Sequence, residues 1–353
     1  METPEQPRMS IRTAASRPVA RLASALLLGA AVLSAGAAQA AEVVVRAGYI
    51  PVLGAAQAFI IDKQGWDKEA GFDLQLTQFD SGPNMIQALA SGTLEGYVAG
   101  VGPLIVARAQ GIGVRVVAST AVEELVVAAG PDLAAAAKGG NAAKAIADLS
   151  AKLGRPVKLA TQPAGSIPNT VLQYWLWRVA GVDKSKVELV PMGIDATQQA
   201  LLAGAVDGAT VREPALTIIR DRLPAVSVLA YGKDMIENQP GTVVGVSEEL
   251  ATKHPEVVQK LVDLTVRATK LIQQDPATAA KAVEQVLGRG LIDAKTMQRA
   301  LTSPASRFSV DPRSIVEKTK LIQDFQVEIG VLKKAEPVDG LFDASFFDKS
   351  PKG

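Results

Sequence analysis

Hydrophobic and polar positions follow two different periods along this chain. Up to about residue 246, short apolar runs alternate with amphipathic stretches, a pattern typical of strands that alternate with helices. Strands are predicted at 43–49, 73–79, 96–101, 114–119, 157–161, 187–190, 226–229 and 241–246, and the apolar segment 125–129 is expected to cross to a second unit. Because strands buried on both faces read as continuous apolar runs, these segments predict mostly parallel sheets flanked by helices.

One sequence pattern occurs twice, at residues 88–96 and 200–208. Both copies run Ala-Leu-x-x-Gly-x-aliphatic-acid-Gly, and a proline follows each, Pro103 or Pro214. Gly92 and Gly204 suit the left-handed residue that ends a helix, and a proline suits the first turn of the next helix. Each copy therefore predicts a helix, a tight turn, a short strand and a second helix. Two such copies predict two similar α/β lobes.

The order of these elements predicts that the chain crosses twice between the lobes. Residues 41–124 and 240–353 are expected to form lobe 1, and residues 125–239 lobe 2. From Pro255 onward the apolar period becomes 3.6 residues, which predicts helices at 255–273, 276–287, 293–301 and 311–329. We expect this helical C-terminal extension to cover lobe 1. The Ala-rich segment 134–154 is interpreted as a surface helical excursion of lobe 2.

Residues 1–40 have the features of a secretory signal peptide. Several arginines precede the apolar segment 22–33, and Ala38-Gln39-Ala40 precedes the predicted cleavage point. The alternative, a membrane anchor, fits less well because the apolar segment is short and rich in small residues. We therefore expect cleavage after Ala40 and a periplasmic product without stable membrane insertion.

Composition removes several functional classes. The 353 residues are 48% hydrophobic but only 4% aromatic, so the cores must consist mainly of aliphatic side chains. A formal net charge of +1 gives no reason to expect a nucleic-acid partner. One histidine and no cysteine exclude thiol nucleophiles, disulfides and Cys/His zinc sites. We expect no cofactor and no metal.

At this point the chain resembles the periplasmic substrate-binding proteins of ABC importers, in the group that serves aliphatic sulfonates, taurine and nitrate. The resemblance rests on Gly48-Tyr49, 79–84, 88–101, Gly165-Ser166, 200–209, Glu213-Pro214 and 341–346. It implies the two-lobed type II periplasmic binding fold, with the ligand held in the cleft and enclosed by a hinge motion. The chain departs from the family at Arg212, where many relatives carry an aromatic residue before the Glu-Pro pair.

A small oxyanion needs inward-pointing donors, and helix N-termini supply free N–H groups with a favourable dipole. Ser81, Gly102 and Ser166 stand at predicted helix starts, and Ser119 and Thr120 stand at the first crossing. For both Ser81 and Ser166, plain helix capping is the alternative role.

Four further residues complete the candidate ligand-binding set. Arg212 is the candidate fixed positive charge, and an ion pair with Glu213 or a contact between the lobes is its alternative role. Glu213 is included beside it. Tyr49 is a candidate apolar wall, and Gln57 could reach the cleft, although a solvated helix face is the simpler interpretation.

Other conspicuous residues receive structural interpretations. Glu95 and Asp207 are expected to stabilise the two repeated turns, and His254 to be a solvated residue at a helix end. Asp195 and Gln198 are predicted to form a capping box. Trp175 and Trp177 cannot share one helix face, so at least one is expected in the core or on the lobe surface.

These observations predict a monomeric, non-enzymatic receptor that binds a small anionic molecule of the sulfonate, taurine or nitrate class and delivers it to an ABC transporter permease. A pyrimidine resembling a thiamine precursor, or an aromatic acid, is the alternative ligand. An enzyme on the same fold is a further alternative, but the one histidine stands in the helical extension. A sensor ectodomain would need a second hydrophobic span, which the pattern does not contain.

Overall fold

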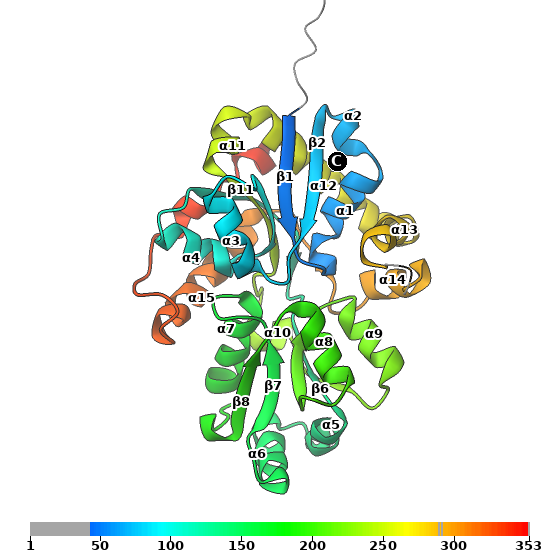
Figure 1. Ribbon diagram of the computed structural model, residues 1–353, viewed down its shortest axis with the longest axis vertical. Helices are drawn as coiled ribbons and strands as arrows, with labels where there is room; N and C mark the ends of the chain where they lie inside the picture. The colour runs from blue at the N-terminus through cyan, green and yellow to red at the C-terminus, as the bar shows by residue number, and fades with distance from the viewer. Residues whose placement is uncertain (1–42, 289, 291, 352–353) are drawn as a thin grey trace, which may run out of the picture. The chain divides into compact units, whose positions relative to one another are not determined.

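The computed structural model describes residues 43–288, 290 and 292–351, and the predicted signal peptide lies outside them. Within this part the strands form two five-stranded sheets, one in each lobe (Figure 1). The order in lobe 1 is β2 (Phe72–Gln78), β1 (Val43–Tyr49), β3 (Gly96–Gly100), β11 (Thr242–Ser247) and β4 (Val114–Ser119). The order in lobe 2 is β10 (Ser227–Tyr231), β6 (Val126–Ala129), β9 (Gly208–Val211), β7 (Val157–Thr161) and β8 (Val187–Pro191). The two-lobed α/β prediction is confirmed.

Each sheet contains one strand that runs against the others. β1 pairs parallel with β2 and β3, whereas β11 is antiparallel to β3 and β4. In lobe 2, β7 is parallel to β8 and β9, whereas β6 is antiparallel to β9 and β10. Both exceptions are the first strands after a crossing. A chain that arrives from the other lobe enters at the carboxyl edge of the sheet, so its strand must run away from that edge.

Lobe 1 has a core on each face of its sheet. Phe59 and Ile60 of α1 (Ala56–Lys63) are fully buried in one core, against α12 (Pro255–Gln274) and α13 (Pro276–Leu287). Met85 of α3 (Gly82–Ala90) and Leu104 of α4 (Gly102–Ala109) belong to the core on the other face. Helices on both faces explain why these strands read as continuous apolar runs.

The remaining elements complete the two lobes and the crossing. Lobe 2 carries α5 (Pro131–Ala136), η2 (Ala137–Gly139), α6 (Ala142–Leu153), α7 (Ile167–Tyr174), η3 (Trp175–Val179), η4 (Lys184–Lys186), α8 (Ile194–Leu202), α9 (Ala215–Arg222) and α10 (Gly232–Met235). The rest of the chain adds η1 (Leu53–Ala55), α2 (Trp66–Glu69), β5 (Ala121–Val122), α11 (Glu248–Lys253), α14 (Ala294–Leu301), β12 (Arg307–Phe308), η5 (Pro312–Ile315), α15 (Val316–Glu328), η6 (Asp339–Leu341) and α16 (Ser345–Lys349). At the crossing, β12 pairs with β5.

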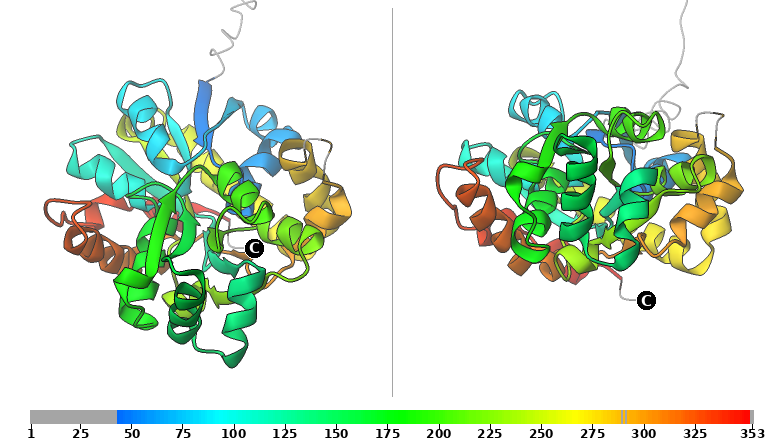
Figure 2. Two further views of the ribbon diagram at one scale, coloured as in Figure 1. Left: turned by 60° about the horizontal axis from the view of Figure 1, so that its bottom comes forward. Right: turned by 90° about the horizontal axis from the view of Figure 1, so that it is seen from below.

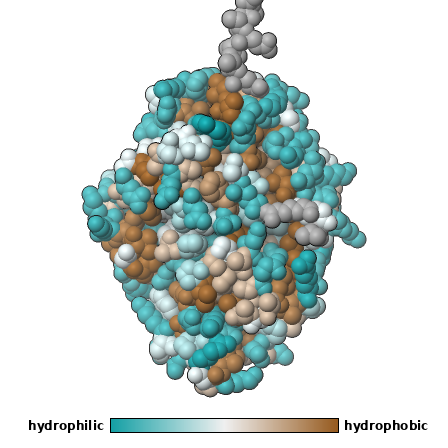
Figure 3. All heavy atoms as spheres, in the orientation of Figure 1, coloured by the Kyte–Doolittle hydropathy of each residue, from teal (hydrophilic) through white to brown (hydrophobic). Residues whose placement is uncertain are grey.

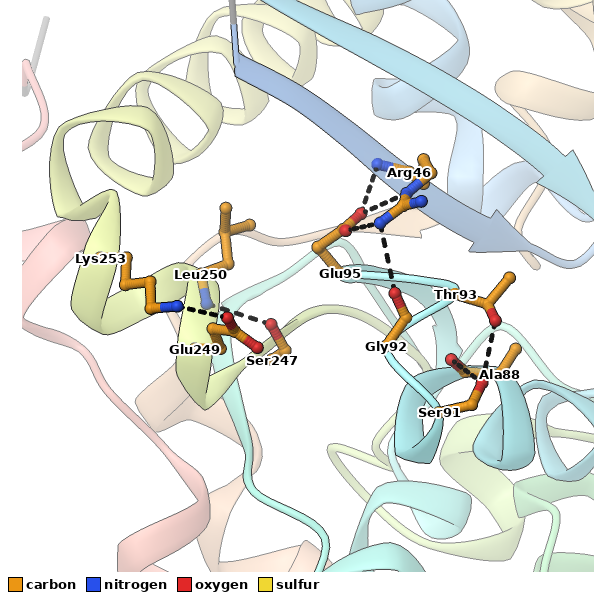
Figure 4. A network of polar contacts seen from close by, with 10 residues as sticks. All are labelled: Arg46, Ala88, Ser91, Gly92, Thr93, Glu95, Ser247, Glu249, Leu250 and Lys253. Atoms are coloured by element: carbon orange, nitrogen blue, oxygen red, sulfur yellow. Dashed lines mark hydrogen bonds and ion pairs between the residues drawn. The ribbon is translucent and has the colours of Figure 1, made fainter.

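The repeated pattern builds the same turn in both lobes. Gly92 and Gly204 have φ values of 71° and 67°, the left-handed conformation that the pattern predicts. Glu95 accepts hydrogen bonds from the backbone N (3.0 Å) and Nε (3.1 Å) of Arg46 on β1 (Figure 4).

Asp207 has the equivalent role in lobe 2. It accepts from Lys158 N on β7 and from Arg155 Nη1, both at 2.7 Å. Each turn acid therefore ties its turn to the neighbouring strand, and the structural interpretation of Glu95 and Asp207 is confirmed.

The C-terminal helices cover lobe 1 as expected where α12 and α13 pack on α1, but others of them also contact lobe 2. Figures 1 and 2 show α13 and α14 on one side of the lobes and α15 on the other. α14 packs against α9 of lobe 2, and Arg299 Nη1 donates to Asp221 Oδ1 at 3.1 Å. α15 packs against α7, with ring centroids of Phe325 and Tyr174 5.3 Å apart. Amphipathic periodicity shows which face of a helix is apolar but not which lobe receives it.

Two further expectations need correction. The segment 134–154 is not only a surface excursion, because Ile146 and Leu149 of α6 are buried in the hydrophobic core. The predicted capping box at Asp195 is wrong, because Gly193 is the N-cap of α8 and makes no side-chain hydrogen bond. The expectations for His254 and Trp175 are confirmed: the His254 side chain is 42% exposed, and Trp175 is core.

Apolar and polar residues are interspersed over the face shown in Figure 3.

Candidate functional site

The carboxyl ends of the parallel strands in both sheets face each other between the lobes (Figure 1). Backbone hydrogen bonds join the lobes there, from Leu53 N to Glu213 O at 2.8 Å and from Ile194 N to Asp80 O at 3.2 Å. A small pocket of about 10 Å³ lies in this region. Its lining comes from both lobes: Ile50, Ser81, Gly82, Gly100, Pro103, Gln162, Ser166, Ile167, Pro168, Ile194 and Arg212. The structure thus brings together three predicted site residues, Ser81, Ser166 and Arg212.

Ser81 and Ser166 both stand at helix N-termini, but their hydroxyls differ. Ser166 Oγ accepts a hydrogen bond from Asn169 N at 3.3 Å, which is a helix cap. Ser81 is the N-cap residue of α3, yet its side chain makes no capping bond. Its Oγ is buried and has no hydrogen-bond partner among the described residues. Burying a hydroxyl without a partner is unfavourable, and this distinguishes Ser81 from the capping Ser166.

Arg212 brings a positive charge to the same pocket. It follows the last residue of β9 and is 5% exposed. Its Nε lies 3.6 Å from Glu124 Oε1, and no hydrogen bond joins this nitrogen to a residue in the described ranges. An arginine carries five N–H donors in a planar fork that matches an oxyanion. The Arg212 guanidinium is thus buried with an ion pair but without a hydrogen bond at Nε.

Glu124 is the counter-charge of Arg212, and the sequence analysis did not identify it. Its side chain is 4% exposed, and its Oε1 accepts from Thr242 Oγ1 at 2.7 Å. Glu124 stands just before β6, where the chain enters from the crossing, and Arg212 stands just after β9, which pairs with β6. Opposite charges so far apart in sequence give no local signal, so only the fold reveals the pair.

A larger cavity of about 220 Å³ adjoins the small pocket. The two share Gln162, Ile194 and Arg212 as lining residues. The other lining residues are Pro51, Val52, Asp195, Gln198, Gln199, Thr210, Val211, Pro214, Ala215, Ile218, Arg222, Leu287, Gly288 and Ile292. None of its glutamines is a predicted site residue, and Gln198 was expected only in a helix cap.

Gly102 lies at a close contact between the two lobes. A Cβ added to it would lie 2.7 Å from Gly165 O of lobe 2. Across this contact, Gln326 of α15 donates from Nε2 to the same oxygen at 3.2 Å. Gly102 therefore allows contact between the lobes and does not line the small pocket.

Gln57 and Tyr49, two predicted site residues, belong to the core region of lobe 1 and line neither cavity. Gln57 is fully buried, and its Nε2 donates to Thr120 O at 2.9 Å and to Thr269 Oγ1 at 3.2 Å. The interpretation of Gln57 as a solvated residue is therefore wrong, because α12 covers that face of α1. Tyr49 is 7% exposed and packs edge-on against Phe59, with ring centroids 4.9 Å apart.

Ser119 and Thr120 lie at the crossing beneath the C-terminal chain. Ser119 N donates to Val310 O at 3.0 Å, and Thr120 N donates to Thr242 O at 2.9 Å. Both hydroxyls are buried without a hydrogen-bond partner in the described part of the chain. Neither residue lines the two cavities described above.

Glu213 engages its own helix. Its Oε2 accepts from Thr217 N and its Oε1 from Thr217 Oγ1, both at 3.0 Å. Burial raises the pKa of Glu213, although its hydrogen bonds to Ser303 and Thr217 act in the opposite direction. Near the small pocket, burial also raises the pKa of Tyr97, whose hydroxyl donates to Gly100 O at 2.7 Å. Tyr97 therefore stays neutral at physiological pH.

Across the described residues, no group of three or more His, Cys, Asp or Glu side chains is placed to hold a metal ion. The donors around the small pocket are instead a guanidinium, two hydroxyls and the N-termini of α3 and α7. This set supplies hydrogen-bond donors, and its one guanidinium is paired with the Glu124 carboxylate.

Two α/β lobes with a pocket between them are the arrangement of the periplasmic binding proteins. The chain belongs to the NMT1-like family, whose model matches residues 38–287. It is 25% identical over 244 residues to the Brucella abortus (strain 2308) protein named "Putative binding protein BAB2_1146", covering 68% of this chain and 70% of that protein.

Two solved structures show the same fold. The alkanesulfonate-binding protein SsuA from Xanthomonas axonopodis pv. citri, bound to MOPS, has a TM-score of 0.67 at 20% identity, with 85% of this chain and 98% of that chain covered. The periplasmic nitrate-binding protein NrtA from Synechocystis PCC 6803 has a TM-score of 0.75 at 13% identity, with 87% and 88% covered. At these identities the likeness concerns the fold. No helix in the described ranges has both the length and the apolar character to cross a membrane.

Proposed function

We propose that this protein is the periplasmic substrate-binding receptor of an ABC import system and that it captures a small oxyanion of the sulfonate, taurine or nitrate class. The observation that carries the proposal is Arg212, which is 5% exposed, lines both cavities and has a buried Nε without a hydrogen bond to a described residue. The free Ser81 hydroxyl in the same pocket supports it. The names of the sulfonate- and nitrate-binding neighbours agree with this ligand class.

In this proposal, lobe 1 (41–124 and 240–353) and lobe 2 (125–239) close over the ligand by a hinge motion at the crossing. The closed monomer then docks on a membrane permease and acts as a carrier, without catalysis. Residues 1–40 direct export and are removed. The arrangement of Ser81 and Gly82 in lobe 1 and Ser166 and Arg212 in lobe 2 supports closure, because the complete donor set exists only when the lobes meet.

The donor set is sufficient for useful affinity. Micromolar binding needs about 8 kcal/mol net. Hydrogen bonds to charged groups contribute about 1.5–3 kcal/mol each, and Arg212, Ser81 and the helix N–H groups together offer several. Closure and ordering reduce this sum, which leaves affinity in the range that a transport receptor needs.

A thermal-shift screen tests the ligand class, with alkanesulfonates, taurine, nitrate, bicarbonate, aromatic acids and pyrimidines as probes. We expect the largest shifts with anions. Calorimetry on Arg212→Lys then tests the site, because lysine keeps the charge but loses the planar fork. We expect about tenfold weaker binding of the best anion, the value of roughly one lost charged hydrogen bond.

Arg313→Lys is the matched control, since Arg313 pairs with Asp311 through Nε at 2.9 Å on the surface. This variant is expected to bind like the parent. A strong shift with pyrimidines alone, or an Arg212→Lys variant with unchanged anion affinity, contradicts the proposal.

A further inference from the structure

Gln162 is an uncharged polar residue that lines both cavities and is almost wholly buried, at 6% exposed. It follows directly after β7, at the carboxyl edge that faces lobe 1. Its backbone oxygen accepts from Asn169 Nδ2 at 3.1 Å, which fixes the chain there. Its side-chain amide, in contrast, makes no hydrogen bond to any residue in the described ranges. Because Gln162 lines both cavities, its amide is available to hydrogen-bond a ligand there.

A bare oxyanion can satisfy only half of this amide. Sulfonate, nitrate and carboxylate groups are acceptors, so they can bond Gln162 Nε2 but not Gln162 Oε1. The larger cavity adds further amide acceptors on α8, those of Gln198 and Gln199, which line it together with Asp195 on the same helix face. The lining therefore calls for hydrogen-bond donors on the ligand as well as acceptors.

The cavity sizes point the same way. About 10 Å³ in the small pocket is room for one water-sized group. An oxyanion can place one oxygen there, beside Ser81, while its other oxygens reach Arg212. The rest of the ligand must then occupy the larger cavity of about 220 Å³, which contains the glutamines.

We propose that Gln162 is a specificity-determining residue, and that the ligand is a small organic anion that also carries N–H donors, as an amino or amido group. Ser81 and Arg212 bind the anionic end. Gln162 accepts from the N–H group through Oε1 and donates to the anionic end through Nε2, and α8 offers the further acceptors. This inference rests on the proposed function, because it assigns the ligand of the same site.

Calorimetry with two pairs of similar-sized ligands tests the inference on the purified protein. The first pair is taurine and propane-1-sulfonate, in which a methyl group replaces the ammonium group. The second pair is succinamate and pentanoate, which differ by the terminal amide. We expect the N–H-bearing member of at least one pair to bind about tenfold more tightly, the effect of leaving a buried acceptor unpaired.

Gln162→Leu keeps most of the side-chain volume and removes the amide. We expect this variant to bind both members of the discriminated pair with similar affinity, mainly by weakening the N–H-bearing member. Gln273→Leu, at an exposed position on α12, is the matched control and should keep the parent's preference.

The outcomes separate the two proposals. If the parent binds the anions in an Arg212-dependent way but shows no preference within either pair, the assignment of Gln162 is wrong and the oxyanion receptor stands. The assignment is also wrong if Gln162→Leu keeps the parent's preference. If no anion binds, the proposed function fails and takes this inference with it.

Discussion

Ser81 and Ser166 offer a comparison in which stability and binding should change separately. Both are buried serines at helix N-termini, at 1% and 4% exposed, and both line the small pocket. Only Ser166 uses its hydroxyl as a cap, through the 3.3 Å bond from Asn169 N. Ser81 Oγ has no such bond to the described residues. Replacing each serine by alanine therefore removes a different interaction.

The magnitudes follow from these contacts. Ser166→Ala removes a helix cap, which costs about 0.5–2 kcal/mol of unfolding free energy. Ser81→Ala removes no hydrogen bond of the folded protein, so its unfolding free energy should stay within roughly 0.5 kcal/mol of the parent's. For ligand affinity, in contrast, we expect the larger effect from Ser81→Ala. Loss of a hydrogen bond to a charged ligand costs about 1.5–3 kcal/mol, which is at least about tenfold in Kd.

Urea unfolding followed by tryptophan fluorescence measures the first quantity, and calorimetry with the best anion from the ligand screen measures the second. Trp175 is buried in lobe 2 and Trp66 is largely buried in lobe 1, so both lobes carry a reporter. The reasoning is refuted if Ser81→Ala loses as much stability as Ser166→Ala, or if it binds the anion as tightly as the parent.

Two further predictions concern lobe contact and pH. Gly102→Ala should weaken anion binding and reduce ligand-induced compaction in small-angle X-ray scattering, because its Cβ would lie 2.7 Å from Gly165 O. Gly139→Ala is the control, because its Cβ would meet nothing within 4 Å. Equal compaction in both variants would contradict this prediction. For Glu213, burial raises the pKa above 4.5, so the folded state holds its proton to higher pH than the unfolded state. The unfolding free energy of the parent relative to that of Glu213→Gln is therefore greatest below about pH 4.5 and falls as pH rises through the folded-state pKa. Urea unfolding of both proteins between pH 4 and 8 measures this difference. A difference in unfolding free energy that is constant with pH contradicts the prediction.

Local patterns predicted the elements of this protein well. The strands Val43–Tyr49, Val114–Ser119 and Val157–Thr161 and the helix Pro276–Leu287 have the predicted bounds, because apolar runs, prolines and capping residues act within a few residues. The repeated glycines and turn acids likewise predicted two similar lobes, since a left-handed residue and a helix end are local requirements. Asp195 shows the limit of such signals, because the sequence predicted a capping box at Asp195 whereas α8 has Gly193 as its N-cap.

The site depended on contacts that no local pattern contains. Ser81 and Ser166 look alike in sequence, and only the surroundings of the two hydroxyls decide that one is a cap and the other is free. The buried partner of Arg212 is Glu124 and not its neighbour Glu213, because the strand order of lobe 2 brings the end of β9 beside the start of β6.

The sequence by itself thus determined the secondary structure, the pairing of two lobes and the candidate residues Ser81, Ser166 and Arg212. The tertiary structure decided which of the candidates meet, that Gln162 joins them, and that the C-terminal helices contact both lobes. The physical reason is range: periodicity and capping are set within one or two turns of chain, whereas burial and partner choice are set by segments far apart in sequence.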